Sequence, residues 1–258
     1  MRSAVIFLDV DSKPARLAEF FKVARDEHQA LDCIAAPYPA HTGRTLIELA
    51  GRVAEDLQGG PPVEHLALIM HGSTTGILRP GSGQGLHVSA SRHPGLYTVD
   101  EFARSWAPVL ADGALISLCA CLCARSPAWY LREAFGSIPS SWGPVSYKAG
   151  GRRSFAGRMR DAFTKRGKSV RVRAHTVVGH VTYSPMLREF GPELGGDGVP
   201  LFELALPGIA PTLANRRRWV RLVRGQLARD WIMGVGDERV IERIRVAWPY
   251  EGSGGAVS

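Results

Sequence analysis

The sequence lacks any long hydrophobic run. None of its 258 residues lies in a stretch near the ~20 consecutive apolar residues that a membrane-spanning helix requires. No small-residue cleavage site follows the short apolar run near the N-terminus, where Asp9 and Asp11 come next. This run therefore predicts a buried strand and not a secretion signal, and we expect a cytoplasmic protein without a membrane partner.

Cysteine is scarce and poorly spaced for a disulfide framework. Three of the four cysteines fall within five residues, which suits reduced thiols in a cytosol and raises the question of a chemical role. The four are Cys33, Cys119, Cys121 and Cys123.

Acidic residues are outnumbered, with 24 Asp and Glu against 32 Lys and Arg, so the formal net charge is +8. The excess is concentrated in residues 148–173 and 216–229. A positive surface attracts nucleic acid or acidic proteins. Because no nucleic-acid-binding motif occurs, we interpret these segments as solvated helix faces and expect no nucleic-acid partner.

The first 124 residues contain alternating strand and helix patterns. Apolar runs of strand length occupy 4–10, 31–36 (ended by Pro37 and Pro39), 66–70 and 114–120. Helical spacing covers 14–29 and 46–57, and a capping box from Thr98 to Glu101 opens a third helix whose apolar side is Phe102, Trp106 and Leu110. Asp112-Gly113 is expected to turn the chain into the fourth strand. This order predicts an α/β fold with a mostly parallel central sheet and helices on both faces.

The second half has weaker patterns. We expect a basic helix at 155–165, a long strand or a hairpin bent at Gly179 over 169–183, a strand at 199–206 and a helix at 215–233. Residues 1–250 are expected to form one domain, in which 1–135 is the core and 136–250 the second half of the sheet with basic helices. The Gly/Ser-rich residues 251–258 are expected to be a flexible tail.

Two chemically active residues stand where expected strands end. His71-Gly72 follows the strand at 66–70, and Cys121 follows the strand at 114–120. Ligands of open parallel sheets bind beyond the carboxyl ends of the strands, and neighbouring strands lie about 4.8 Å apart. A thiolate nucleophile needs a base, and its oxyanion needs backbone N–H donors, which the flexible Gly72 can present. The pattern predicts a Cys–His catalytic site.

The segments LALIMHG (66–72) and ALISLCAC (114–121) resemble the caspase-like cysteine peptidases, which include caspases, metacaspases and bacterial CHAT proteases. In that family one apolar strand ends in His-Gly and a second ends in a small residue followed by Cys. The helix in YTVDEFARSWAPVLADGA is similar to its CHAT counterpart, and the resemblance covers about residues 3–135. It implies a caspase-like fold and a cysteine endopeptidase with Cys121 as nucleophile, His71 as acid–base residue and Gly72 at the oxyanion. It also implies a protein or peptide substrate and neither cofactor nor metal.

Two features of the predicted site have alternatives: which cysteine is the nucleophile, and which P1 residue the site accepts. Ala120-Cys121 aligns with the family's small residue–Cys pair, which favours Cys121 as the nucleophile, with Cys123 as the next candidate. Otherwise Cys119 and Cys123 are interpreted as small buried hydrophobes. Metacaspases specific for basic residues hold an Asp two residues before the nucleophile, where this chain has Cys119. The candidate substrate-binding carboxylates, Asp9 and Asp11, either receive a basic P1 side chain or cap the next helix. Two cations, Arg152 and Arg153, favour an acidic P1 instead.

Three other functions compete with the peptidase. The first is an α/β-hydrolase whose base is His175 or His180, although the glycines of a nucleophile elbow are missing around Cys121. A zinc site on the three clustered cysteines with His71 is disfavoured because ligands two residues apart on one strand splay too far. The third is a binding module that lacks activity and uses its basic second half.

Overall fold

A seven-stranded sheet forms the centre of the computed structural model. The structure describes residues 2–8, 34, 38–73, 77–80, 85–87, 97–127, 147–149, 151–176, 187–206, 208–210, 212, 214–215 and 217–219. The strand order is β13-β12-β11-β8-β3-β1-β2. The parallel strands are β1 (Ser3–Leu8), β2 (Tyr38–Ala40), β3 (Val63–Ile69), β8 (Leu110–Cys119) and β11 (Val170–His175). The antiparallel strands are β12 (Leu187–Phe190) and β13 (Val199–Pro200). The expected α/β fold with a mostly parallel sheet is confirmed.

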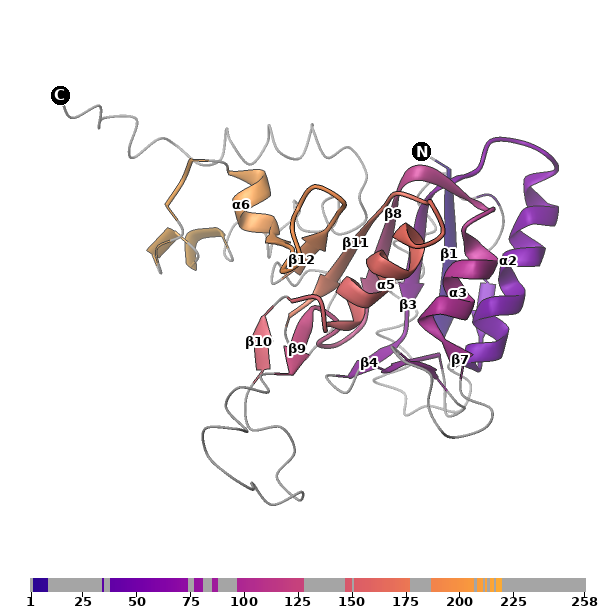
Figure 1. Ribbon diagram of the computed structural model, residues 1–258, viewed down its shortest axis with the longest axis horizontal. Coiled ribbons are helices and arrows are strands. Elements are labelled where there is room, and N and C mark those ends of the chain that lie inside the picture. The colour runs from indigo at the N-terminus through magenta and orange to yellow at the C-terminus, as the bar shows by residue number, and fades with distance from the viewer. Residues whose placement is uncertain are drawn as a thin grey trace, which may run out of the picture.

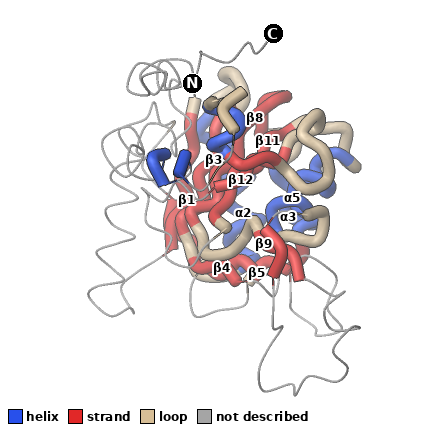
Figure 2. Tube along the Cα trace, turned by 90° about the vertical axis from the view of Figure 1, so that its left-hand side faces the viewer, coloured by secondary structure: helices blue, strands red, loops and turns tan. Residues whose placement is uncertain are grey.

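Three helices cover one face of this sheet: α2 (Gly43–Leu57), α3 (Val99–Trp106) and α5 (Phe155–Thr164). The crossovers from β2 to β3, from β3 to β8 and from β8 to β11 all proceed in one direction along the sheet. Because parallel crossovers are right-handed, all three helices must lie on the same side, as Figures 1 and 2 show. The helix expected at 14–29, and most of the one expected at 215–233, lie outside the described residues.

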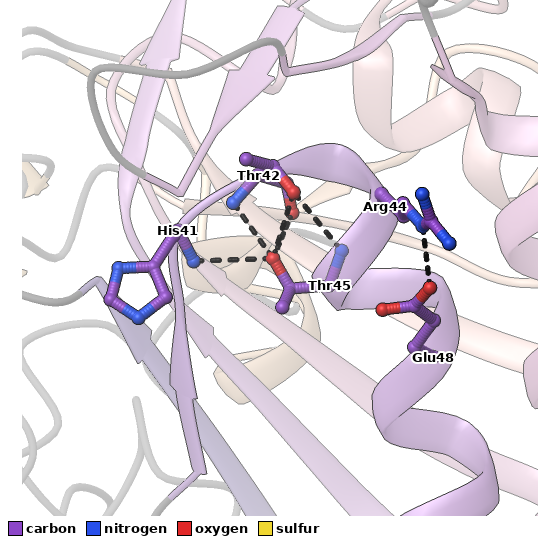
Figure 3. A network of polar contacts seen from close by, with 5 residues as sticks. All are labelled: His41, Thr42, Arg44, Thr45 and Glu48. Atoms are coloured by element: carbon purple, nitrogen blue, oxygen red, sulfur yellow. Dashed lines mark hydrogen bonds and ion pairs between the residues drawn. The ribbon is translucent and has the colours of Figure 1, made fainter.

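Helix α2 begins at a reciprocal capping box. The hydroxyl of Thr42 accepts the backbone N–H of Thr45 at 3.2 Å, and Thr45 Oγ1 accepts the backbone N–H of Thr42 at 2.8 Å, so two donors of the helix start are satisfied (Figure 3). The N–H of His41 also reaches Thr45 Oγ1, and Arg44 pairs with Glu48 one turn on, at the surface (Figure 3). The local sequence thus fixes where the helix starts.

Aromatic side chains join the three helices. The indole Nε1 of Trp106 donates to the backbone oxygen of Leu46 at 2.7 Å, which ties α3 to α2. Phe102 stacks on Trp106 and meets Phe163 of α5 edge to face. All three rings are buried. As expected, Thr98 and Glu101 form the capping box of α3.

A row of buried polar residues crosses one face of the central sheet. Parallel and antiparallel partners place Ser3 beside His65, Ser117 beside Arg173, and Arg173 beside Glu189. The imidazole Nε2 of His65 lies 2.9 Å from the Ser117 hydroxyl, and the Arg173 guanidinium makes bonds of 3.0 and 2.7 Å to Glu189. Each charge is paired, as a buried ion must be.

Two strand boundaries differ from the sequence prediction. Pro39 was expected to end a strand but lies inside β2, where the missing N–H is tolerated because β2 is the edge of the sheet. The third helix ends at Trp106, before Pro108, so Leu110 begins β8, and Asp112 and Gly113 belong to that strand. Gly113 supplies the positive φ of 77° that the strand needs there.

The expected strand at 199–206 is wrong beyond its first two residues. Pro200 ends β13, and the apolar run that follows is the short helix α6 (Leu201–Ala205). Short apolar runs do not distinguish strand from helix by periodicity. Of the region expected as a strand or hairpin at 169–183, the structure describes residues 169–176, namely Ser169, β11 and Thr176.

Among the described helices, none is long and apolar enough to cross a membrane.

Candidate active site

The ends of β3 and β8 lie side by side at one edge of the central sheet. Ile69 is the register partner of Cys119, and the N–H of Met70 donates to the Cys119 carbonyl at 3.3 Å. The next residues along the two strands are therefore His71 and, past Ala120, Cys121. The structure thus brings both predicted residues beyond the same edge.

Two small sheets extend from this edge. The chain after β3 forms β4 (His71–Ser73), β5 (Ile77–Arg79), β6 (Leu86–His87) and β7 (Tyr97–Thr98). The chain after the cysteines forms β9 (Arg125–Pro127), paired with β10 (Tyr147–Ala149). Figure 1 shows β4, β9 and β10 at the same end of the central sheet. Residues 73–95, which the sequence marks only as glycine- and serine-rich, thus contribute short strands beside His71.

Gly72 packs directly against the cysteine turn. A Cβ built on Gly72 would lie 2.5 Å from the carbonyl oxygen of Cys121, 2.5 Å from Cys123 Sγ and 3.0 Å from Ala120 Cβ. Any side chain here would displace backbone atoms of the turn. The structure therefore gives Gly72 a packing role besides the predicted N–H donor role, and it fixes His71, its neighbour, next to the turn.

The turn that follows Cys121 is held from three directions. The Cys123 carbonyl accepts the N–H of Ala156 in the first turn of α5, at 3.0 Å. The N–H of Ala124 donates to the carbonyl of His175 at the end of β11, also at 3.0 Å. The N–H of Arg125 closes the turn on the Leu122 carbonyl at 3.0 Å. Helix α5 and strand β11 therefore both set the position of Cys121.

Leu122 has a left-handed backbone, with φ of 60°. For a residue other than glycine this conformation costs roughly 1–2 kcal/mol, and it persists only where the surroundings impose it. Nothing in the sequence indicates it, since leucine has no preference for such turns. Strain of this kind is often found at functional sites.

Only one of the three clustered cysteines has a partly exposed side chain. Cys119 and Cys123 are buried, as expected of small hydrophobes, and Cys121 is partly exposed. Burial, and to a lesser extent the neighbouring Cys121, raises the pKa of the Cys123 thiol far above its usual range. Cys123 is thus a neutral packing residue at ordinary pH. The fourth cysteine, Cys33, lies outside the described residues.

The histidines differ in accessibility. His71 is partly exposed, whereas His175 is completely buried at the end of β11. The proposed rival base His180 and the candidate carboxylates Asp9 and Asp11 lie outside the described residues. Arg152 and Arg153 are exposed and lie just before α5.

Within the described part of the chain, no group of three His, Cys, Asp or Glu residues could hold a metal ion.

Comparison with known proteins finds no family model, no curated protein and no solved structure that matches the chain.

Proposed function

We propose that this protein is a cysteine endopeptidase with a caspase-like fold that cleaves protein or peptide substrates through Cys121 and His71. The observation that carries the proposal is the close packing of Gly72 on the Cys121 carbonyl, 2.5 Å from where a Cβ would stand. This packing fixes a histidine and a partly exposed thiol beyond adjacent ends of two parallel strands. A nucleophile and its base require such proximity.

The residues have distinct roles in the proposed reaction. The Cys121 thiolate attacks the scissile carbonyl carbon, a C–S bond forms, and the carbonyl electron pair moves to oxygen. Backbone N–H groups of Gly72 and Cys121 hold this oxyanion. When it collapses, the C–N bond breaks and His71 donates a proton to the leaving amine. Water then hydrolyses the thioester, with His71 as the base.

The test is a cleavage profile on a peptide library. We expect the wild-type protein to cleave some peptides, and Cys121→Ala and His71→Ala each to abolish cleavage while the melting temperature changes little. Cys119→Ala is the matched control, because it removes a buried thiol from the same strand end and leaves Cys121 in place. Cleavage by Cys121→Ala would refute the assignment.

The α/β-hydrolase alternative predicts a different histidine dependence. In that mechanism the base is a late histidine, such as His175, which here is completely buried. Turnover lost in His175→Ala while His71→Ala stays active, with both proteins folded by circular dichroism, would favour the hydrolase.

A further inference from the structure

We infer that the backbone N–H groups of Leu122 and Cys123, together with the guanidinium of Arg125, form an oxyanion site on the turn after Cys121. The inference rests on the proposed function and adds donors to those of Gly72 and Cys121. It is based on two unmatched backbone N–H groups, on a buried Arg125 Nε without a partner among the described residues, and on the left-handed Leu122.

Two carbonyls of the turn already accept hydrogen bonds, while two of its N–H groups are unmatched among the described residues. The carbonyls of Leu122 and Cys123 already accept the N–H groups of Arg125 and Ala156, each at 3.0 Å. In contrast, the N–H groups of Leu122 and Cys123 have no acceptor among the described residues. Leu122 is partly exposed and Cys123 is buried, and neighbouring unmatched donors on such a turn create a positive potential that favours an anion.

Arg125 adds a positive charge to the same turn. Its Nε is buried and has no hydrogen-bond partner within the described part of the chain. A buried donor without an acceptor costs about 1–3 kcal/mol, so such a group calls for a ligand or another explanation. Elsewhere the buried arginines are satisfied: Arg160 bonds Asp161 and two carbonyls, and Arg173 bonds Glu189.

The left-handed Leu122 explains how successive N–H groups serve one anion. Consecutive residues of right- and left-handed conformation, or a tight turn, direct neighbouring N–H groups into one concavity. Leu122 has φ of 60°, and Cys121 before it has no positive φ. In α/β-hydrolases the N–H of the residue after the nucleophile also binds the oxyanion, so the position is chemically suitable.

The N–H donors act on the negative charge that develops on the carbonyl oxygen of the substrate. Attack by the Cys121 sulfur moves the carbonyl π electrons to oxygen, and the negative oxygen accepts N–H bonds that the neutral carbonyl accepts only weakly. Removing one such donor typically lowers kcat by about 10²–10³-fold. Because the donors act on the transition state, kcat should fall and KM should change little.

The direct test replaces single backbone amides by esters. Incorporating the α-hydroxy analogue of leucine at position 122, or of cysteine at 123, removes one N–H and keeps the side chain. We expect kcat for the best library peptide to fall about 100-fold at each position, with KM within a few-fold. The matched control is the same change at Val99 in the first turn of α3, where a helix N–H has no intrahelical partner. Ester proteins at 122 and 123 that match the Val99 ester in kcat would overturn the inference.

Side-chain variants keep the inference testable if the esters do not fold. Leu122→Gly and Leu122→Asn both tolerate a positive φ, whereas a β-branched residue resists that conformation. We therefore expect Leu122→Val to lower kcat much more than Leu122→Gly or Leu122→Asn. Equal activity of Leu122→Val and Leu122→Gly would contradict the role of the left-handed turn.

Arg125 is tested by charge removal and restoration. We expect Arg125→Gln to lower kcat roughly tenfold or more, Arg125→Lys to recover part of it, and the exposed Arg104→Gln on α3 to leave it unchanged. A change confined to KM would assign Arg125 to ground-state binding and overturn its part in the site. If no peptide is cleaved in a Cys121-dependent way, the proposed function itself fails, which is a separate outcome.

Discussion

Gly72 lies so close to Cys121 that a Cβ at position 72 would stand 2.5 Å from the Cys121 carbonyl oxygen. Real side chains do not approach a carbonyl so closely, so the two strand ends meet only because residue 72 has no side chain. The strand register supports the same contact, since Ile69 pairs with Cys119. The His-Gly pair is therefore a packing requirement of the cysteine turn.

Gly72→Ala should destabilise the protein and abolish hydrolysis. The added methyl meets Cys121 oxygen and Cys123 Sγ, and overpacking of this kind costs about 1–3 kcal/mol. The free energy of unfolding in urea measures the loss. Gly51→Ala is the control, because a Cβ there meets nothing within 4 Å on α2 and should stabilise the helix. If Gly72→Ala is as stable and as active as Gly51→Ala, the contact is not tight in solution.

The buried Cys123 makes stability depend on pH in the alkaline range. Burial, then the nearby Cys121, raises the pKa of its thiol in the folded protein, whereas an unfolded cysteine titrates near pH 8.5. Above about pH 8.5 the unfolded chain loses a proton that the folded chain keeps, so the free energy of unfolding should fall as pH rises, by up to about 1.4 kcal/mol per pH unit.

Urea titrations at several pH values from neutral to alkaline measure this slope. Cys123→Ala lacks the thiol and should show a shallower decrease, while Cys119 and Cys121 contribute equally to both proteins. Identical slopes would mean that Cys123 ionises normally in the folded state. In the native protein at mildly alkaline pH, iodoacetamide should modify Cys121 well before Cys123.

Glu189→Gln should strongly destabilise the sheet. Arg173 and Glu189 have side chains exposed by only 2% and 5%, so replacing the carboxylate breaks a buried ion pair, a loss of about 3–5 kcal/mol. Arg171, which lies 3.4 Å from the same carboxylate, would lose this ion pair as well. The double variant Arg173→Met with Glu189→Leu should be more stable than Glu189→Gln alone, because it removes both charges.

Glu48→Gln is the control for that prediction. Its pair with Arg44 is solvent-exposed on α2 (Figure 3), where salt and water screen the charges. Urea unfolding should detect no change for this variant. Comparable losses in the free energy of unfolding for Glu48→Gln and Glu189→Gln would contradict the placement of Glu189 among the buried polar residues of the central sheet.

The start of α5 should couple stability to activity. The hydroxyl of Ser154 accepts the N–H of Gly157 at 3.0 Å, and two residues after Ser154 the N–H of Ala156 holds the Cys123 carbonyl. Ser154→Ala should cost about 1 kcal/mol and lower kcat through the turn. Thr42→Ala removes the equivalent cap of α2, which does not hold the turn, and should reduce stability without changing kcat. If Ser154→Ala and Thr42→Ala have the same kcat, the start of α5 does not control the geometry of the cysteine turn.

The sequence predicts those parts of the fold that local patterns determine. The capping box at Thr98, the strand before His71 and the helix at 155–165 are all present, because capping chemistry and apolar periodicity act over a few residues. The run at 199–206 was predicted wrongly because a short apolar segment fits either structure, and Pro39 was misread because its tolerance depends on the edge position of β2.

The details of the site depend on contacts that are distant in sequence. The sequence indicates His71 and Cys121 through their strand ends, but not that Gly72 must fit against the Cys121 carbonyl. Leu122 and Arg125 gave no signal, because a left-handed leucine follows from bonds to α5 and β11 and an unpartnered Nε depends on the whole surroundings. Such features form only when the cysteine turn, α5 and β11 come together in the folded protein.

The bonds that hold the cysteine turn also impose an order on biosynthesis. On the ribosome, Cys121 and His71 are translated well before Ala156 and His175, whose backbones hold the turn. A nascent chain arrested before His175 therefore contains both members of the pair without the carbonyl that fixes Ala124. The two hydrogen bonds from α5 and β11 that hold the turn can therefore form only after His175 has been synthesised.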